Sequence, residues 1–222
     1  MEEPKRVVQR GYDQIAERHA QWAIHTRAKE RARYTARLLA ALPPGASLLE
    51  LGCGVGGPTT QALAAQFRLT GVDISACSLE LARRNVPQAR FLQGDMAEID
   101  LPPASFDAVA AFYSIIHVPR DEQPGLLGRV AEWLRPDGLF LAAFGTADEA
   151  VGFEPDWLGV PMYWSTYDSE TTQRLVTSAG LSITSATLET ADEDGVPVSF
   201  LWVEARRSAL LTCGSDGSPE NV

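Results

Sequence analysis

Apolar and polar residues alternate in blocks along the middle of the chain, and the blocks predict strands and helices in turn. Short apolar runs indicate buried strands, and a segment with helical spacing of apolar residues follows most of them. Strands separated by helices indicate a parallel sheet with right-handed crossovers and helices on both faces. The pattern therefore predicts an α/β fold. The expected strands cover residues 47–51, 68–73, 90–94, 106–112 and 138–144, and the expected helices cover residues 58–66, 76–85 and 121–134.

The two ends of the chain depart from this alternation. Residues 1–42 have the pattern of two helices that end at a proline-glycine stop, so we expect an N-terminal helical cap on a main domain of residues 43–206. Two late apolar runs, residues 181–189 and 196–204, predict a pair of strands joined by an acidic turn. The polar residues 207–222 are expected to form a disordered tail.

A glycine-rich turn, residues 52–57, follows the first buried strand and leads into Pro58. Glycine permits positive φ and lets the backbone approach a ligand closely. Pro58 suits the first position of a helix, whose N-terminus leaves free N–H donors for a polar or anionic ligand. We interpret this stretch as a cofactor-binding turn.

The spacing Gly52-x-Gly54-x-x-Gly57 also matches the dinucleotide fingerprint, with Asp73 about where an acidic ribose ligand is expected. Two further carboxylates speak against a nicotinamide cofactor: Glu50 would lie beside a pyrophosphate, and Asp95 follows the third strand. Three acidic groups at successive strand ends suit a ligand with hydroxyls, amines and positive charge. S-adenosylmethionine (SAM) is such a ligand, and NAD is kept as the alternative.

Five motifs in the same order resemble the class I SAM-dependent methyltransferases of the small-molecule methyltransferase-domain type. The matching segments are Glu50 to Gly56, Gly71 to Ser75, Gln93 to Met96, Phe106 to Val109 and Leu134 to Gly138. The resemblance implies a Rossmann-like, mainly parallel sheet of seven strands with an antiparallel last strand. It also implies methyl transfer to O, N, S or C of a small molecule, with S-adenosylhomocysteine (SAH) as the product. A SAM-binding enzyme that cyclises, eliminates or rearranges on the same scaffold stays as the alternative.

The resemblance implies that residues at the strand ends bind the cofactor. Asp73 is expected to accept hydrogen bonds from both ribose hydroxyls, and Asp95 to accept one from the adenine amino group. The glycine turn is expected to hold the amino-acid end, with Glu50 organising it. The complete set of expected cofactor residues is Glu50, Gly52, Cys53, Gly54, Asp73, Ile74, Asp95, Met96, Ala111 and Phe112.

Two residues are candidates for catalysis. His117 follows the fourth strand, where the methyl group is expected to point, and its ordinary pKa near 6.5 suits a general base; a structural bond to the loop is the alternative. Tyr12 shares a helical face with Ile15 and His19. That face either packs on the domain or, as the resemblance implies, places Tyr12 near the methionine end of SAM.

Residues 146–168 are expected to form an aromatic lid, because they contain more apolar rings than a solvent loop does. The lid either forms a small satellite core or lines the acceptor pocket with rings for a flat or cationic substrate, and the two readings are compatible. The expected substrate-binding residues are Tyr12, Tyr113, His117, Trp157, Met162, Tyr163 and Trp164.

Composition restricts the partners. The formal net charge is −10, which disfavours an extended nucleic acid, and we expect the basic run from Arg27 to Arg37 to be a solvated helix face. Three cysteines and three histidines without ligand spacing predict neither a metal site nor a disulfide framework. No apolar run reaches the ~18 residues of a membrane span, and the first residues lack a signal-peptide profile. We therefore expect a cytoplasmic protein with a small-molecule acceptor; the pattern does not specify an oligomeric state.

Overall fold

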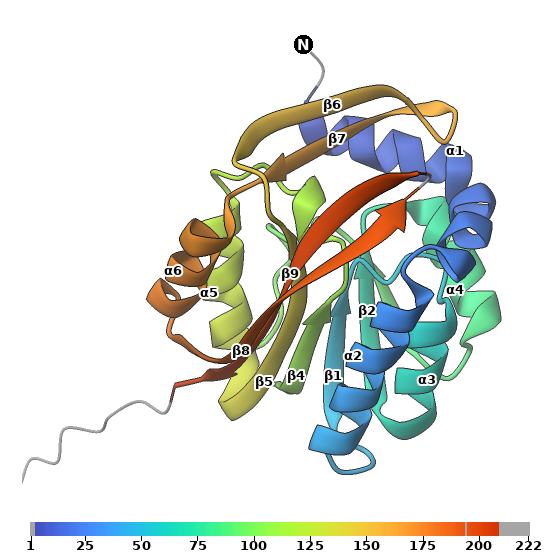
Figure 1. Cartoon of the computed structure of the whole chain (residues 1–222). Helices are drawn as coiled ribbons and strands as arrows, with labels where there is room; N and C mark the ends of the chain where they lie inside the picture. The colour runs from blue at the N-terminus through green and yellow to red at the C-terminus, as the bar shows by residue number, and fades with distance from the viewer. Residues whose placement is uncertain (1–2, 194, 209–222) are drawn as a thin grey trace, which may run out of the picture.

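The computed structural model describes residues 3–193 and 195–208. The strands of its main sheet are β1 Ser47–Leu51, β2 Arg68–Asp73, β3 Arg90–Gln93, β4 Phe106–Ala111, β5 Leu134–Gly145, β8 Leu181–Glu193 and β9 Val196–Arg207. They form one seven-stranded sheet of order β3-β2-β1-β4-β5-β9-β8 (Figure 1). The first five strands are parallel, and β9 runs antiparallel to both of its neighbours. The predicted mainly parallel sheet with an antiparallel last strand is confirmed.

Strand β1 is central because it pairs with β2 on one side and with β4 on the other. Leu48, Leu49 and Leu51 are completely buried. Successive side chains of a strand point to opposite faces of the sheet, and accordingly Leu49 and Leu51 belong to one apolar cluster while Leu48 belongs to the other. The apolar run of β1 is thus explained by burial on both faces.

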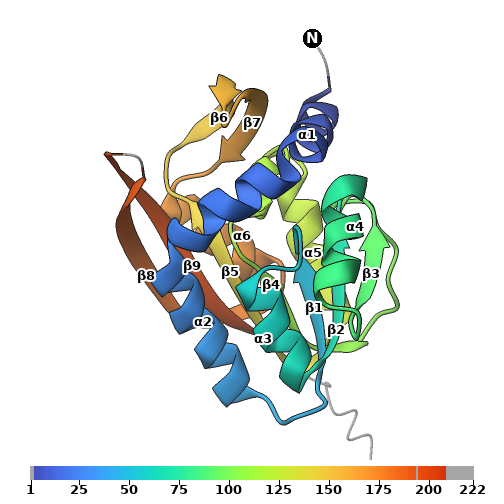
Figure 2. The ribbon, with the colours of Figure 1, turned by 90° about the vertical axis from the view of Figure 1, so that its right-hand side faces the viewer.

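Helices cover both faces of this sheet (Figures 1 and 2). Helices α2 (Ala28–Ala41), α3 (Pro58–Gln66) and α4 (Ala76–Asn85) lie on one face, and α5 (Gln123–Trp133) and α6 (Ser169–Ser178) lie on the other. Each face therefore buries its own apolar cluster, as expected for an α/β fold.

A further layer lies over the carboxyl ends of the parallel strands. Helix α1 (Pro4–His25) crosses there beside a two-stranded antiparallel sheet of β6 (Glu149–Trp157) and β7 (Val160–Thr166) (Figure 2). Ile15 of α1 and Met162 of β7 are almost completely buried in one apolar cluster. We call α1, β6 and β7 together the roof.

The hydrophobic pattern did not predict the roof hairpin or α6 as regular elements. The residues of the expected aromatic lid form the hairpin β6–β7, of which Val151 and Phe153 are exposed. Whether the hairpin acts as a lid stays a prediction. Helix α6 begins after Asp168, whose carboxylate accepts a hydrogen bond from the N–H of Thr171 at 2.8 Å. Its Ser- and Thr-rich sequence has no clear helical period of apolar residues.

The predicted disordered tail lies, from residue 209 onward, outside the described residues. Whether residues 1–42 act as a separate cap stays a prediction. Among the helices of the described ranges, none is long and apolar enough to cross a membrane.

Candidate active site

A cavity of about 710 Å³ lies between the carboxyl ends of the strands and the roof. A cavity of this size falls in the range that holds a small-molecule ligand. Most of the site residues expected from the sequence line it, although they come from five different elements and the loops between them. These are Tyr12, Gly52, Gly54, Asp73, Ile74, Asp95, Met96, Phe112, Tyr113, His117, Trp157 and Trp164.

Five expected site residues do not line the cavity. Glu50 and Cys53 are buried beside it, and Ala111 is completely buried in the sheet. Met162 and Tyr163 pack against α1 in the apolar cluster of the roof. The side chains of Met162 and Tyr163 therefore belong to a small satellite core, whereas Trp157 and Trp164 line the cavity.

The glycine turn after β1 is packed on one side and open on the other. The N–H groups of Gly52 and Cys53 both donate to the carbonyl of Val72, at 2.8 and 3.1 Å. Gly52 has a φ of +74°, and a Cβ there would clash with the Cβ of Ser114. Gly54 has a φ of +54° and lines the cavity, and a Cβ there would meet no atom within 4 Å. The turn thus leaves an open cradle beside its backbone.

Asp73, the last residue of β2, fixes this turn. Its carboxylate accepts hydrogen bonds from the N–H of Gly54 at 2.8 Å and from the N–H of Ser75 at 2.9 Å. Burial raises the pKa of Asp73, and the two N–H donors oppose that rise. Because a carboxylate has about four lone-pair sites, it keeps acceptor capacity toward the cavity.

Asp95 is paired with a residue that the sequence did not indicate. Its Oδ2 lies 2.5 Å from Nζ of Lys5 in α1, and its Oδ1 accepts a hydrogen bond from the N–H of Ala97 at 2.8 Å. Lys5 also pairs with Glu98 and Glu122. Burial lowers the pKa of Lys5, but the three carboxylates outweigh it and raise that pKa above its ordinary value. The acidic cluster therefore already holds a cation.

Glu50 is a buried carboxyl group beneath the turn. Its Oε1 accepts a hydrogen bond from the Thr60 hydroxyl at 3.1 Å, and its Oε2 has no hydrogen-bond partner among the described residues. Burial raises the pKa of Glu50 to about 8, and the nearby Asp73 adds to the rise. Glu50 is therefore mostly protonated, and so uncharged, at neutral pH.

His117 and Tyr12 are in direct contact. The Nδ1 of His117 lies 2.8 Å from the carbonyl oxygen of Tyr163, so we assign the ring proton to Nδ1. The Nε2 then accepts a hydrogen bond from the hydroxyl of Tyr12 at 2.8 Å. Burial lowers the pKa of His117 to about 4 and raises the pKa of Tyr12 well above its ordinary value. The premise that His117 keeps its ordinary pKa is therefore wrong, because the sequence did not reveal its burial.

Five rings form what we call the aromatic wall of the cavity: Tyr12, His19 and Trp22 from α1, Trp157 from β6 and Trp164 from β7. Neighbouring rings have centroids 5.1 to 6.0 Å apart. Burial lowers the pKa of His19 to about 4, so this imidazole is neutral as well. The sequence placed His19 on the helical face of Tyr12 and Ile15 and did not assign it to the site; in the structure it lines the cavity.

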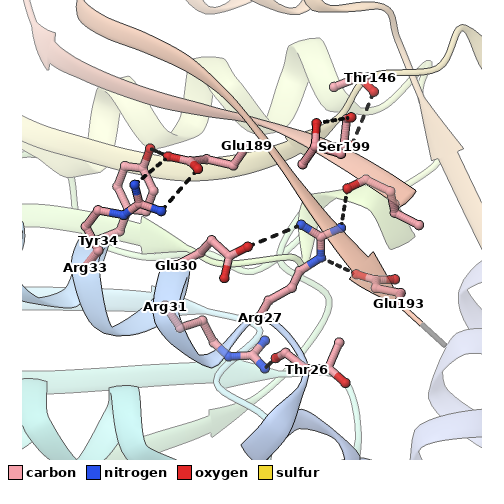
Figure 3. Close-up of polar contacts among 12 residues, drawn as sticks. Thr26, Arg27, Glu30, Arg31, Arg33, Tyr34, Thr146, Glu189, Glu193 and Ser199 are labelled. Atoms are coloured by element: carbon pink, nitrogen blue, oxygen red, sulfur yellow. Dashed lines mark hydrogen bonds and ion pairs between the residues drawn. The ribbon is translucent and has the colours of Figure 1, made fainter. Parts of the chain in front are cut away.

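The basic run is only in part the solvated face that the sequence suggested: Lys29, Arg33 and Arg37 are exposed, whereas Arg27 and Arg31 are not. Arg27 lies at the junction of α1 and α2 with a φ of +55°, and only 5% of it is exposed. Its Nε pairs with Glu193, and its Nη2 donates to the carbonyl of Val198 at 2.6 Å (Figure 3). Arg27 and Arg31 both line the cavity. The hairpin of β8 and β9 thus reaches back to the first two helices.

Together these features define an α/β protein whose ligand cavity lies where the strand order reverses, beside β1 and β4. Residues 48–138 match the family model described as "Methyltransferase domain". This part of the chain is a methyltransferase domain of the class I SAM-dependent type.

Two curated relatives illustrate the sequence similarity. The 27-O-demethylrifamycin SV methyltransferase of Amycolatopsis mediterranei is 32% identical over 169 residues, which cover 66% of this chain and 61% of that protein. The trans-aconitate 2-methyltransferase of an Enterobacter species is 38% identical over 114 residues, which cover 50% of this chain and 44% of that protein. The chain spans 61% or less of the length of both of these relatives.

Solved structures share the fold. A SAM-dependent methyltransferase from Methanosarcina mazei has a TM-score of 0.68 at 14% identity, covering 77% of this chain and 96% of that chain. The [4+2]-cyclase SpnF has a TM-score of 0.62 at 17% identity, covering 79% of this chain and 80% of that chain. Since a methyltransferase and a cyclase share this fold, the fold alone does not define the reaction.

Proposed function

We propose that the chain binds SAM at one end of the cavity and transfers its methyl group to a small-molecule acceptor at the other end. The observation that carries this proposal is one continuous cavity whose lining changes across the sheet. Gly54 and Asp95 follow β1 and β3 and Asp73 ends β2, whereas Tyr113 follows β4 and Phe200 lies in β9. The strand order separates these two groups, so each forms its own end. Family membership and the names of the relatives support the same function.

The residues of the first end fit SAM. The open side of Gly54 is a cradle for the amino-acid end, and Asp73 keeps lone pairs for the ribose hydroxyls. Asp95 already binds an ammonium group, that of Lys5, and so offers an acceptor for the adenine amino group. The apolar side chains of Ile74 and Met96 line the cavity nearby and suit the adenine ring.

When bound, SAM supplies an electrophilic methyl group on a sulfonium. The chain itself orients the acceptor and excludes water, and such positioning provides much of the acceleration in reactions of this kind. The roof covers the cavity for this purpose. The Tyr12 hydroxyl is placed to take a proton from an acceptor while its own proton passes to Nε2 of His117. The carbonyl of Tyr163 keeps His117 in the tautomer that leaves Nε2 free to receive it.

Three further statements belong to the same proposal. The acceptor is a small molecule, which the volume and the roof of the cavity support. The negative net charge supports the absence of a nucleic-acid partner. We also propose a cytoplasmic location, as expected from the sequence.

Calorimetric titration with SAM, SAH and NAD tests the cofactor. We expect micromolar binding of SAM and SAH and no binding of NAD. Asp73→Asn should weaken SAM binding at least tenfold. Asp107→Asn is the matched control, because Asp107 also accepts a backbone N–H, that of Ser47, but does not line the cavity.

Binding of NAD alone, or of none of the three, would contradict the proposal. Product analysis then tests the reaction. A methylated acceptor with SAH is the expected product pair, and release of SAM unchanged beside a cyclised or rearranged acceptor would favour the alternative reaction class.

A further inference from the structure

Two buried donors at the far end of the cavity lack a hydrogen-bond partner among the described residues. They are Nη1 of Arg27 and the hydroxyl of Tyr113. Both residues line the cavity, and the guanidinium carbon of Arg27 lies 5.7 Å from the centroid of the Tyr113 ring. Buried polar groups are nearly always paired, so each exception calls for a partner. Burial raises the pKa of the Tyr113 hydroxyl, and the Arg27 guanidinium is close enough to oppose that rise. An arginine cannot accept a hydrogen bond, so the hydroxyl proton still needs an acceptor, and the ligand can supply it.

The guanidinium of Arg27 is held in place by its other two nitrogens. Its Nε pairs with Glu193 and its Nη2 with the carbonyl of Val198 (Figure 3). The remaining Nη1 lies 4.0 Å from the nearest carboxylate oxygen, that of Glu30, which is too far for a hydrogen bond. The group is therefore fixed before a ligand arrives, which reduces the entropic cost of binding.

Tyr113 is also fixed. Its φ of +60° places an aromatic residue in the left-handed region, a strained conformation that surrounding contacts must hold. The ring packs edge-on against Phe200 at 4.8 Å and against Trp202 at 5.4 Å. The Arg31 guanidinium lies 5.3 Å from the centroid of the same ring. The Tyr113 ring is thus held beside the guanidinium of Arg27, whose Cζ lies 5.7 Å from the ring centroid.

We propose that Arg27 and Tyr113 bind a carboxylate of the acceptor, whose flat body lies against the aromatic wall. An arginine has no acceptor capacity, so the ligand group must accept hydrogen bonds, and an ammonium group cannot. A carboxylate accepts from both donors at once, and its bond to Arg27 is charge-assisted. The described contacts of Arg31 are to the carbonyls of Ala23 and Thr26, which leave its charge without a carboxylate at hydrogen-bond distance. This inference rests on the proposed function and specifies its substrate class.

The test uses the full chain saturated with SAH and three ring skeletons, each as carboxylate, amide and amine. The probes are phenylacetate, cinnamate and indole-3-acetate, with phenylacetamide, cinnamamide and indole-3-acetamide, and with phenethylamine, cinnamylamine and tryptamine. We expect at least one carboxylate to bind at least tenfold more tightly than the amide and the amine of its own skeleton. An amine that binds best would instead assign the aromatic wall to a cation. An amide that binds equally would show that a neutral oxygen suffices. Either result overturns the proposal.

Tyr113→Phe locates the site. Because the hydroxyl of Tyr113 has no partner in the described structure, its removal should not lower the melting temperature, while carboxylate affinity should fall at least fivefold. Tyr34→Phe is the matched control, since the hydroxyl of Tyr34 donates to Glu189 at 3.1 Å and lies outside the cavity. This control should lower the melting temperature and leave carboxylate binding unchanged. Unchanged carboxylate affinity in Tyr113→Phe would contradict the assigned site.

The same titrations distinguish this proposal from the proposed function. If SAH binds and no carboxylate binds, the carboxylate subsite is wrong and the cofactor assignment stands. If SAH does not bind, the proposed function itself fails.

Discussion

The hydroxyl of Tyr12 lies 2.8 Å from Nε2 of His117, although the two residues are 105 positions apart in the chain. The other nitrogen of the same imidazole lies 2.8 Å from the carbonyl of Tyr163. One ring that follows β4 is therefore bonded to both parts of the roof, α1 through Tyr12 and β7 through Tyr163. His117 cannot rotate away from either partner without leaving a buried polar group unpaired.

Tyr12→Phe should slow methyl transfer and leave SAM binding nearly unchanged. The variant removes the hydroxyl that we propose links the acceptor to His117, and it leaves Nε2 without its donor. The free energy of unfolding should also fall by about 1–3 kcal/mol, the usual cost of an unpaired buried polar group. Steady-state kinetics and urea denaturation measure the two effects.

His117→Ala should likewise spare SAM binding and slow turnover. If Tyr12 and His117 act as one relay, the double variant should be no slower than the slower single variant, because residues that act as a unit are not additive. If His117→Ala has the same rate as the wild type at every pH, positioning alone suffices for catalysis and the imidazole is structural.

Stability should fall in weak acid because of the two neutral histidines. Burial lowers the pKa of His117 and of His19 to about 4, against about 6.5 in the unfolded chain. Between these pH values the unfolded state binds more protons than the folded state. The contribution of the two histidines to the free energy of unfolding is therefore complete above pH 6.5 and is lost as the pH falls toward 4. In His117→Gln the drop in unfolding free energy between pH 7 and pH 5 should be smaller, with the part due to His19 remaining. Equal drops in both proteins would contradict the shifted pKa of His117.

Glu50 should act on stability in the opposite sense. Burial raises its pKa to about 8, so between about pH 4.5 and pH 8 the folded state holds a proton that the unfolded state releases. This contribution is complete below pH 4.5 and is lost as the pH rises through 8. Glu50→Gln keeps a neutral side chain at every pH. Between pH 6 and pH 9 its melting temperature should therefore fall by less than that of the wild type. An identical loss in both proteins would argue that Glu50 is ionised at neutral pH.

Two glycines of the same turn should respond differently to alanine. Gly52→Ala forces a Cβ against Ser114 at a φ of +74° and should lower the free energy of unfolding by about 2–5 kcal/mol, from overpacking and backbone strain together. Gly54→Ala meets no neighbouring atom, so backbone strain alone should cost about 1–2 kcal/mol. Its methyl group should instead weaken SAM binding. Urea denaturation measures the stability of both variants, and titration with SAM measures their cofactor binding. Equal destabilisation by Gly52→Ala and Gly54→Ala would contradict the close packing of Gly52 against Ser114.

The sequence predicted the parallel part of the sheet because its strands are short, mainly apolar segments separated by turns and helical segments. β1 and β2 begin and end at the expected residues. The hairpin of the roof gave no such signal: in β6 only Gly152 is buried, so its side chains do not alternate between apolar and polar. Its partner surface is on α1, more than a hundred residues earlier, and only the folded chain brings the two together.

The candidate site was predictable to the extent that a residue directly follows a strand. Asp73 and Asp95 could be placed in this way, since the carboxyl ends of parallel strands share one edge of the sheet. Lys5 and Arg27 could not, because their partners are distant in sequence. Arg27 also has a positive φ, a conformation that its residue type does not predict. The ordinary pKa assumed for His117 failed for a related reason, since its burial comes from the roof.

Arg27 and Glu193 are 166 positions apart, and their contact closes the far end of the cavity. On the ribosome, the residues assigned to the cofactor are complete once Phe112 has been added, whereas Glu193 and Val198 follow about eighty residues later. At roughly 5–20 residues per second this interval lasts several seconds or more. If Arg27 binds the acceptor as proposed, the groups that hold it in place are made only after every residue assigned to the cofactor.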